Sequence, residues 1–268
     1  MKRIESRNNP TIKNITSLRD KRERESQRLF FFEGVHLLEE YLRFGKTPHA
    51  IFVREDVTER YAELLSRAEC EKYEVTASVY EKLSEEKAPQ GILTVSGYPD
   101  NVKLISEGEY CKLPEKIKGN AIMLADLQDN GNVGTVIRTA ATLDCDVILC
   151  GKCADIFSAK TARATMGALF AADIYVCPDT VEAVKALEAA GKRVIAAALD
   201  DKASLLGEFE ILQTDIFVVG NEGKGLTQEV ISACGKTAII PMSGKTESLN
   251  AATAAAILLW EAKRGKIK

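Results

Sequence analysis

Two loops rich in glycine and polar side chains follow short apolar runs in the C-terminal half of the chain. Residues 216–219 are an unbroken run of β-branched and aromatic side chains, which is typical of a strand buried on both faces. Three glycines among residues 220–225 flank Glu222 and Lys224 and allow the backbone to approach a ligand closely. This stretch therefore predicts a strand that ends in a ligand-binding loop.

A second apolar run, residues 238–240, is followed by another polar loop. Pro241 ends this strand and residues 243–247 are mostly polar. Either Ser248 or Asn250 then caps a helix rich in alanine and leucine. Because ligands of α/β proteins bind at the carboxyl ends of parallel strands, both loops predict ligand chemistry at such an edge.

The elements that must position these loops alternate between strand and helix from residue 121 onward. The expected strands are residues 121–125, 147–150, 174–176, 193–198, 216–219 and 238–240, and the expected helices are residues 132–143, 159–165, 181–190 and 249–263. This alternation predicts an α/β fold with a mainly parallel sheet covered on both faces. The dinucleotide-binding fingerprint GxGxxG is absent, because the glycines of residues 131–134 and 220–225 have the wrong spacing.

The first hundred residues carry a smaller pattern of the same kind. The expected strands are residues 50–53, 73–76 and 91–95, and the expected helices are residues 36–44, 57–68 and 79–84. Residues 98–120 contain several prolines and glycines without a steady period, which is typical of a linker. A small α/β domain is therefore predicted ahead of the larger one.

Three ordered motifs in the C-terminal half resemble those of the SpoU (TrmH-like) branch of the SPOUT RNA methyltransferases. Residues 128–140, QDNGNVGTVIRTA, are similar to the family's Gln-Asp-Pro-x-Asn-x-Gly run followed by Arg-Thr-Ala. Residues 220–226, GNEGKGL, and residues 240–250, IPMSGKTESLN, are similar to its second and third motifs. One departure is Asn130, which stands where the family usually has proline.

The resemblance implies transfer of a methyl group from S-adenosylmethionine to a ribose 2'-hydroxyl of RNA. The positions that match the family's catalytic residues are Asn132, Arg138, Glu222, Ser248 and Asn250, and those that match its cofactor-binding residues are Gly220, Asn221, Ile240, Met242 and Leu249. The resemblance also implies a SPOUT fold with a trefoil knot, in which the chain after Ile240 passes through a loop. It further implies a homodimer that pairs through the helices at residues 132–143 and 249–263.

Arg138 matches the position usually assigned as the base in this family. A guanidinium has a pKa above about 12, which makes it a poor proton acceptor. We therefore expect Arg138 to stabilise the developing alkoxide and to hold a neighbouring phosphate. Glu222 is expected to orient Arg138 or Asn132 by hydrogen bonding, and the alternative is a carboxylate that caps the helix beginning near Thr227.

The N-terminal stretch is basic although the whole chain carries a net charge of −3. Residues 1–28 hold nine Lys or Arg and four Asp or Glu, a local charge of +5 that leaves −8 for the remainder. A basic arm suits contact with RNA phosphates. The alternative is a solvated helix held by the i,i+4 pairs Arg19–Glu23 and Lys21–Glu25.

Residues 1–105 resemble, more loosely, the ribosomal-protein-like domain that binds substrate in many SpoU methyltransferases. We therefore expect an RNA substrate-binding domain over residues 1–105, a linker over residues 106–118 and a methyltransferase domain over residues 119–268. This layout is usual for modification of ribosomal RNA, so the large-subunit RNA is the expected substrate. Transfer RNA, or a role in RNA binding without catalysis, are the alternatives.

Composition argues against several other classes of protein. The chain is 46% hydrophobic and 28% charged, has no apolar run of the roughly 20 residues a membrane span needs, and begins without the apolar stretch of a signal peptide. A cytoplasmic protein without a membrane partner is therefore expected. The Gly-Lys-Thr runs at residues 235–237 and 244–246 lack the glycine that a P-loop needs five positions earlier.

Cysteines are too scattered to suggest a disulfide framework or a metal site. The chain has seven of them, and Cys145, Cys150 and Cys153 are spaced like part of an iron–sulfur ligand set. The only histidines, His36 and His49, are expected to be structural residues among core neighbours. Since Cys150 ends an apolar strand, it is expected to pack as a small hydrophobe, and no metal is predicted.

Overall fold

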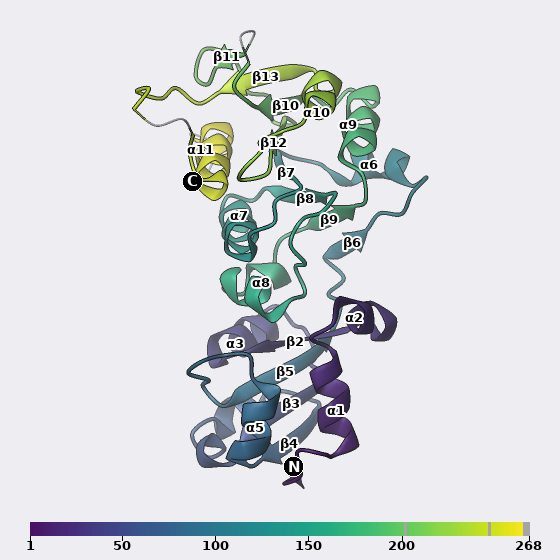
Figure 1. Cartoon of the computed structure of the whole chain (residues 1–268), viewed down its shortest axis with the longest axis vertical. Helices are drawn as coiled ribbons and strands as arrows, with labels where there is room; N and C mark the ends of the chain where they lie inside the picture. Colours follow the sequence, from purple (N-terminus) through teal and green to yellow (C-terminus); the bar gives the residue numbers. More distant parts are fainter. Residues whose placement is uncertain (201–202, 246–247, 265–268) are drawn as a thin grey trace. The chain divides into compact units, whose positions relative to one another are not determined.

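The computed structural model describes residues 1–200, 203–245 and 248–264, so part of the predicted loop at residues 243–247 lies outside the described residues (Figure 1). The chain forms two compact units, one of Met1–Asp100 with Asp155–Phe170 and one of Asn101–Ala154 with Ala171–Lys268. The alternation of strands and helices does not predict that Asp155–Phe170 joins the first unit. Among the described residues, no helix is long and apolar enough to cross a membrane.

The second unit is built on an eight-stranded sheet whose neighbouring strands are all parallel. Its strands are β6 (Val102–Leu104), β7 (Ala121–Ala125), β8 (Asp146–Cys150), β9 (Ile174–Cys177), β10 (Val194–Ala197), β11 (Ser204–Leu205), β12 (Ile216–Val219) and β13 (Lys236–Ile239). Their order across the sheet is β11-β13-β10-β12-β7-β8-β9-β6. The predicted α/β fold with a mainly parallel sheet is therefore confirmed, whereas the threading of the chain after Ile240 stays a prediction.

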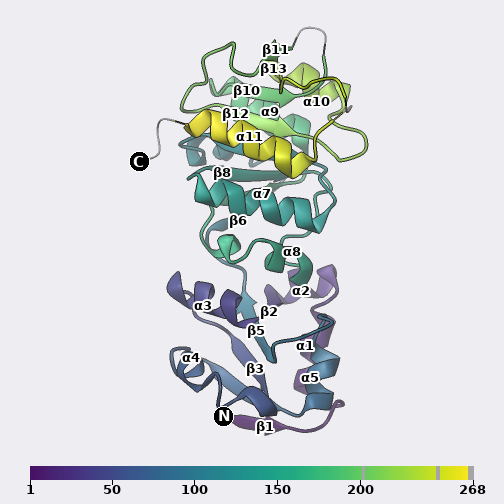
Figure 2. The same cartoon turned by 90° about the vertical axis from the view of Figure 1, so that its left-hand side faces the viewer.

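Helices cover both faces of this sheet, which is why its central strands are apolar along their whole length. The helices are the 3₁₀ helix η2 (Tyr110–Lys112), α6 (Leu113–Lys116), α7 (Asn130–Thr142), α9 (Thr180–Ala189), α10 (Gln228–Ala233) and α11 (Ala251–Lys263). Figures 1 and 2 show α7 and α11 side by side on one face, with α9 and α10 on the other. Both α7 and α11 therefore begin near the edge where β7 and β12 end.

Side chains fix where the two helices of the first face begin. The side chain of Asp129 accepts a hydrogen bond from the backbone of Asn132 and caps α7. Asn250 accepts from the backbone of Ala252 at 2.9 Å and of Thr253 at 3.2 Å and caps α11. Of the two residues that the sequence proposed for this cap, Asn250 is thus the one that fills it.

The first unit contains a five-stranded mixed sheet in the order β1-β4-β3-β5-β2. Its strands are β1 (Lys2–Ile4), β2 (Leu29–Glu33), β3 (Ala50–Arg54), β4 (Glu71–Val75) and β5 (Ile92–Gly97), and its helices are α1 (Pro10–Ser17), α2 (Lys21–Gln27), α3 (Val35–Arg43), η1 (Glu55–Val57), α4 (Ala62–Ser66), α5 (Ala77–Leu83), α8 (Ala159–Ala164) and η3 (Ala168–Phe170). The single helix predicted over residues 57–68 is wrong. A hydrogen bond from Ala62 N to Glu59 O interrupts the i+4 series there, so η1 and the short α4 replace it.

Much of the basic N-terminal stretch is used in contacts within the first unit. Lys21 lies 3.7 Å from Glu25, as the i,i+4 pattern predicts. Arg19 does not pair with Glu23. Its guanidinium instead pairs with Glu85 at 3.2 Å and donates hydrogen bonds to three carbonyls at the end of α5.

Arg24 is buried and pairs with the segment that joins this unit from later in the chain. Its Nη2 donates to Asp155 Oδ2 at 2.6 Å, and its Nη1 donates to the carbonyls of Leu18 and Arg19, each at 2.7 Å. The two charged side chains are only 6% and 18% exposed. Arg24 therefore acts inside the fold and is withheld from any contact with RNA.

Aromatic packing attaches the same segment. The ring of Phe157 stacks on Tyr98 with centroids 3.7 Å apart, and it also contacts Phe30 at 5.1 Å. Further along, Phe170 packs edge-on against Tyr41 at 4.9 Å. Since all of these rings are buried or half-buried, Asp155–Phe170 is part of the core of this unit.

Replacing Arg24 by methionine should lower the free energy of unfolding by about 3 kcal/mol, because it leaves the Asp155 carboxylate without its buried partner. Methionine keeps the length of the apolar stem, so lost packing contributes little. Urea unfolding of the whole chain, followed by circular dichroism, measures the change.

The matched control is Arg22→Met on the same helix, since Arg22 is exposed and makes no side-chain hydrogen bond or ion pair with the described residues. This variant should stay within about 0.5 kcal/mol of wild type. Equal stability of the two variants would contradict a structural role for Arg24.

Candidate functional site

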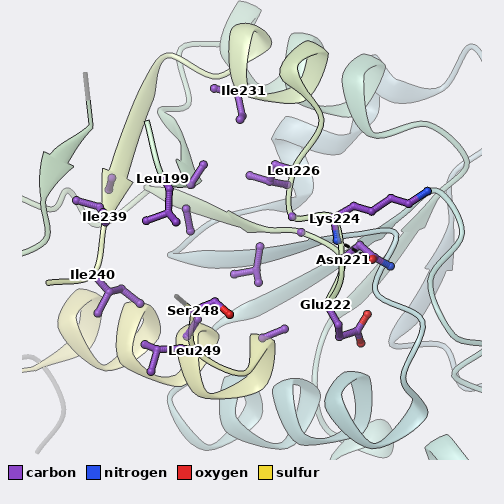
Figure 3. A pocket seen from close by; sticks show the side chains of 18 of the residues that line it. Leu199, Asn221, Glu222, Lys224, Leu226, Ile231, Ile239, Ile240, Ser248 and Leu249 are labelled. Atoms are coloured by element: carbon purple, nitrogen blue, oxygen red, sulfur yellow. Dashed lines mark hydrogen bonds between the residues drawn. The ribbon is translucent and has the colours of Figure 1, made fainter. Parts of the chain in front are cut away.

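A pocket of about 460 Å³ opens at the carboxyl ends of β10, β12 and β13 in the second unit (Figure 3). Its walls are residues 197–199, residues 219–226, residues 238–240 and the first turn of α11. The volume lies within the range of small-molecule sites. The two loops that the sequence singled out thus line one and the same pocket.

The residues that match the family's cofactor positions are all part of this lining, namely Gly220, Asn221, Ile240, Met242 and Leu249. Gly220 has a steric reason to be glycine, because a Cβ atom there would collide with the backbone of Gly225. The loop turns back on itself through two backbone hydrogen bonds between Asn221 and Gly225. The lining is thus backbone from β12 on one side and apolar side chains from β13 and α11 on the other.

The side chain of Asn221 braces this loop from within. Its Oδ1 accepts hydrogen bonds from the backbone of Gly223 at 2.9 Å and of Lys224 at 3.2 Å. Its Nδ2 donates to the carbonyl of Asp126 at 3.0 Å. Because the side-chain atoms of Asn221 and its backbone N–H and C=O all have partners within the fold, Asn221 holds the shape of the loop.

A chain of hydrogen bonds joins the three motifs beside the pocket. The carboxylate of Glu222 accepts from Asn132 Nδ2 at 3.2 Å, from the backbone of Asp129 at 3.0 Å and from that of Gln128 at 3.4 Å. Asn132 Oδ1 in turn accepts from Asn250 Nδ2 at 3.0 Å. Residues about 90 and 118 positions apart in sequence are thereby held within one network.

These contacts also decide the charge of Glu222. Partial burial raises the pKa of the Glu222 carboxyl, but hydrogen bonds from its own backbone, from Asn132 and from the backbone of Asp129 together outweigh burial and hold the pKa below its ordinary value. The group is therefore ionised at neutral pH and acts only as an acceptor. The alternative, in which the Glu222 carboxylate caps the helix that begins near Thr227, is wrong, because the hydroxyl of Thr227 itself caps α10.

Of the other matched residues, Ser248 joins the pocket and Arg138 stands apart from the network. Ser248 lines the pocket near Leu249, as Figure 3 shows. Arg138 is exposed on α7 and makes no side-chain hydrogen bond or ion pair with the described residues. It lies six residues after Asn132, or about 120° around the helix axis. Glu222 thus orients Asn132, and the guanidinium of Arg138 is available to another molecule.

Asp126, directly after β7, is a residue that sequence reasoning missed. It adopts a left-handed backbone with φ of 55°, which few residues other than glycine adopt. Its Oδ1 accepts from the backbone of Lys152 at 2.7 Å, and its carbonyl accepts from Asn221. It thus ties the turn after β8 to the loop after β12. An aspartate immediately after a buried strand, at the same edge as Gly220, was the available signal.

Replacing Asp126 by alanine should lower the free energy of unfolding by about 2–3 kcal/mol, from the strained backbone and the lost hydrogen bond. Asp126→Asn keeps an acceptor oxygen and tolerates the left-handed conformation, so it should cost less than about 1 kcal/mol. Urea unfolding of both variants measures the difference. Indistinguishable stabilities of the alanine and asparagine variants would rule out this bracing role.

The three clustered cysteines are buried or half-buried in the second unit. Cys150 and Cys177 are buried side by side on β8 and β9, and burial raises the pKa of the Cys153 thiol to about 11. Within the described ranges, no three histidine, cysteine or acidic side chains group as a metal site would require. The expectation that His36 and His49 lie among core residues is wrong, because both are exposed.

Two models of known protein families match this chain. Residues 119–260 match the sequence model of the SpoU rRNA Methylase family, and residues 9–94 match that of the MRM3-like substrate binding domain. The first match spans all three motifs, and the second lies inside the smaller unit.

Relatives match over nearly the whole chain. The 23S rRNA (guanosine(2553)-2'-O)-methyltransferase RlmP of Bacillus subtilis (strain 168) is 33% identical over 266 residues, which cover 97% of this chain and 98% of the relative. An AdoMet-bound rRNA methyltransferase from Sinorhizobium meliloti has a TM-score of 0.83 at 29% identity, with 100% of this chain and 99% of that chain covered. With its three motifs assembled around one pocket and its sequence matched in this way, the chain belongs to the SpoU rRNA methylase family.

Proposed function

We propose that this protein transfers the methyl group of S-adenosylmethionine to a ribose 2'-hydroxyl of large-subunit ribosomal RNA. The observation that carries the proposal is the hydrogen-bonded network of Glu222, Asn132 and Asn250 beside the pocket, which unites the three family motifs. The relative from Bacillus subtilis is named for this reaction on a guanosine of 23S rRNA, and the structure from Sinorhizobium meliloti holds AdoMet.

The pocket suits S-adenosylmethionine in size and in chemistry. Ile240, Met242 and Leu249 offer apolar contact for an adenine ring, and the turned backbone of residues 220–226 offers amides and carbonyls. When bound, the cofactor supplies a methyl group that its sulfonium makes electrophilic. The protein must therefore align the ribose oxygen and favour loss of its proton.

Glu222 and Asn132 position polar groups in this reaction without exchanging protons. The ionised Glu222 fixes the amide of Asn132 in one orientation, and Asn250 holds the other end of that amide. A carboxylate with a lowered pKa is a weak base, so Glu222 is unsuited to take the 2'-hydroxyl proton. Ser248, at the pocket wall, is placed to hydrogen bond with a bound ligand.

Arg138 supplies the positive charge that the transition state needs. Its exposed guanidinium has five donors and no partner among the described residues. It can therefore hold a phosphate of the RNA as a bidentate donor and stabilise the alkoxide that develops as the proton leaves to water.

Arg138→Ala should lower kcat at least about 100-fold and leave the affinity for S-adenosylmethionine within about twofold, since its contribution arises in the transition state. Arg138→Lys should not restore the rate, because lysine lacks the planar fork. Transfer of labelled methyl groups to ribosomal RNA gives kcat, and isothermal titration gives the affinity. Lys185→Ala, on the opposite face of the sheet, is the control, and a near-normal kcat for Arg138→Ala would overturn the assignment.

We propose that residues 1–105 form an RNA substrate-binding domain, followed by a linker at residues 106–118 and the methyltransferase domain at residues 119–268. The match of residues 9–94 to a substrate-binding domain supports this assignment. We propose that the protein acts in the cytoplasm, where it would meet its ribosomal RNA substrate.

The active protein is proposed to be a homodimer formed through α7 and α11. Trp260 on α11 is 58% exposed, although it lies on a helix whose other large side chains are mostly buried. Large aromatic residues are frequent anchors of protein interfaces. A second copy of this chain would cover Trp260.

Trp260→Glu should convert the protein to a monomer and reduce methyl transfer, because a charge replaces the interface anchor without disturbing a buried position. Analytical ultracentrifugation at assay concentration measures the assembly. Ala189→Glu, exposed on α9, should remain dimeric and active. A wild-type monomer with full activity would contradict the proposed assembly.

A further inference from the structure

A second pocket, of about 200 Å³, lies within the first unit and shares no residue with the pocket described above. It is lined by Glu33, Glu85, Glu86, Ala159, Lys160 and Arg163. The three glutamates come from the N-terminal part of the chain, and the other three residues come from Asp155–Phe170. The pocket is therefore complete only when that segment is packed in this unit.

Glu33 places a buried carboxylate in this pocket. The residue is 5% exposed, and its carboxylate accepts three hydrogen bonds, from Ser84 Oγ at 2.6 Å, from the backbone of Glu85 at 2.8 Å and from the Tyr80 hydroxyl at 3.4 Å. Burial raises the pKa of Glu33, and the nearby Glu86 and Glu85 raise it further. A carboxylate has about four acceptor positions, so these contacts leave Glu33 able to accept another hydrogen bond.

Glu86 is held in place by Arg163. Its Oε1 lies 2.8 Å from Arg163 Nη1, and the side chain of Glu86 is only 18% exposed. No hydrogen bond reaches Glu86 Oε2 from the described residues. Glu86 therefore presents an oriented acceptor oxygen in a partly enclosed position.

Two cations border these acceptors. The side chain of Arg163 is 49% exposed and uses few of its five donors on Glu86. Lys160 is exposed and pairs with no acid among the residues that the structure describes. Oxygen acceptors and exposed cations thus meet in a pocket with room for a single planar base.

We propose that this pocket binds one unpaired guanosine of the RNA substrate. A carboxylate can accept both N1–H and N2–H of guanine, whereas uracil offers a single donor, N3–H, between two carbonyl oxygens that the glutamates would repel. Lys160 and Arg163 would hold the adjoining phosphate. Sequence-specific recognition of RNA usually takes place on such single-stranded bases.

This inference rests on the proposed RNA substrate and adds a base-specific contact in the substrate-binding unit. The nucleotide bound here is distinct from the one that is methylated, because this pocket contains none of the three methyltransferase motifs. Its role is to select and position the RNA.

The test measures binding of the full-length protein to three single-stranded oligouridine RNAs by fluorescence anisotropy. One carries a single central guanosine, one carries inosine in its place and one carries uridine. Wild type should bind the guanosine RNA roughly 10-fold tighter than the uridine RNA, with inosine between them because it lacks the N2 amino group.

Variants separate base recognition from phosphate contact. Glu86→Gln keeps the size of the side chain and should bring the ratio of guanosine to uridine affinity close to one. Glu85→Gln tests the same ratio at a glutamate that is more exposed. Lys160→Ala should weaken the binding of all three RNAs by about the same factor. Glu63→Gln, an exposed acid on α4, should change none of the affinities.

Equal binding of the guanosine and uridine RNAs by wild type, or an unchanged ratio in both glutamine variants, would overturn the inference. Methyl transfer to ribosomal RNA by the same wild-type preparation separates this result from a failure of the proposed function. A wild-type protein that methylates RNA but does not distinguish guanosine from uridine refutes only the guanosine pocket.

Discussion

The hydrogen-bond chain from Glu222 through Asn132 to Asn250 is the contact on which the methyltransferase site depends. It joins the loop after β12 to the first turns of α7 and α11, which are far apart in sequence. A parallel sheet brings these ends to one edge, but it does not fix the side chains there. The network fixes them. The ionised state of Glu222 strengthens the network, because hydrogen bonds to charged acceptors are stronger than hydrogen bonds to neutral ones. Asp126 adds a second brace by holding Asn221 and the turn after β8.

The segment Asp155–Phe170 has a comparable part in the smaller unit. It leaves the sheet of the second unit after β8, packs Phe157 and Phe170 into the aromatic core and returns to β9. It also brings Asp155 to Arg24 and forms one wall of the guanosine pocket. Removing residues 1–100 would therefore expose the apolar rings of Phe157 and Phe170, which pack within the smaller unit.

Sequence reasoning was most successful where local patterns and global fold agree. The apolar runs at residues 121–125 and 216–219 are strands with those bounds, because strands buried on both faces show continuous hydrophobicity. The single helix predicted over residues 57–68 is wrong. Apolar residues at helical spacing there belong to the 3₁₀ helix η1, a turn and the short α4. Charge counting could not reveal that Arg24 is buried, because its partner lies 131 residues away. Likewise, spacing alone could not decide that Glu222 orients Asn132, while Arg138 has no partner among the residues that the structure describes.

A double-mutant cycle on affinity for S-adenosylmethionine tests most directly whether the three motifs act as one hydrogen-bonded unit. Glu222→Ala removes one end of the chain, and Asn250→Asp keeps the cap of α11 but removes the donor to Asn132. Isothermal titration of wild type, both single variants and the double variant gives the coupling. We expect the double variant to bind little more weakly than either single variant, with a coupling energy of at least about 0.5 kcal/mol. Strictly additive losses would show that Glu222 and Asn250 act independently and would contradict a shared network.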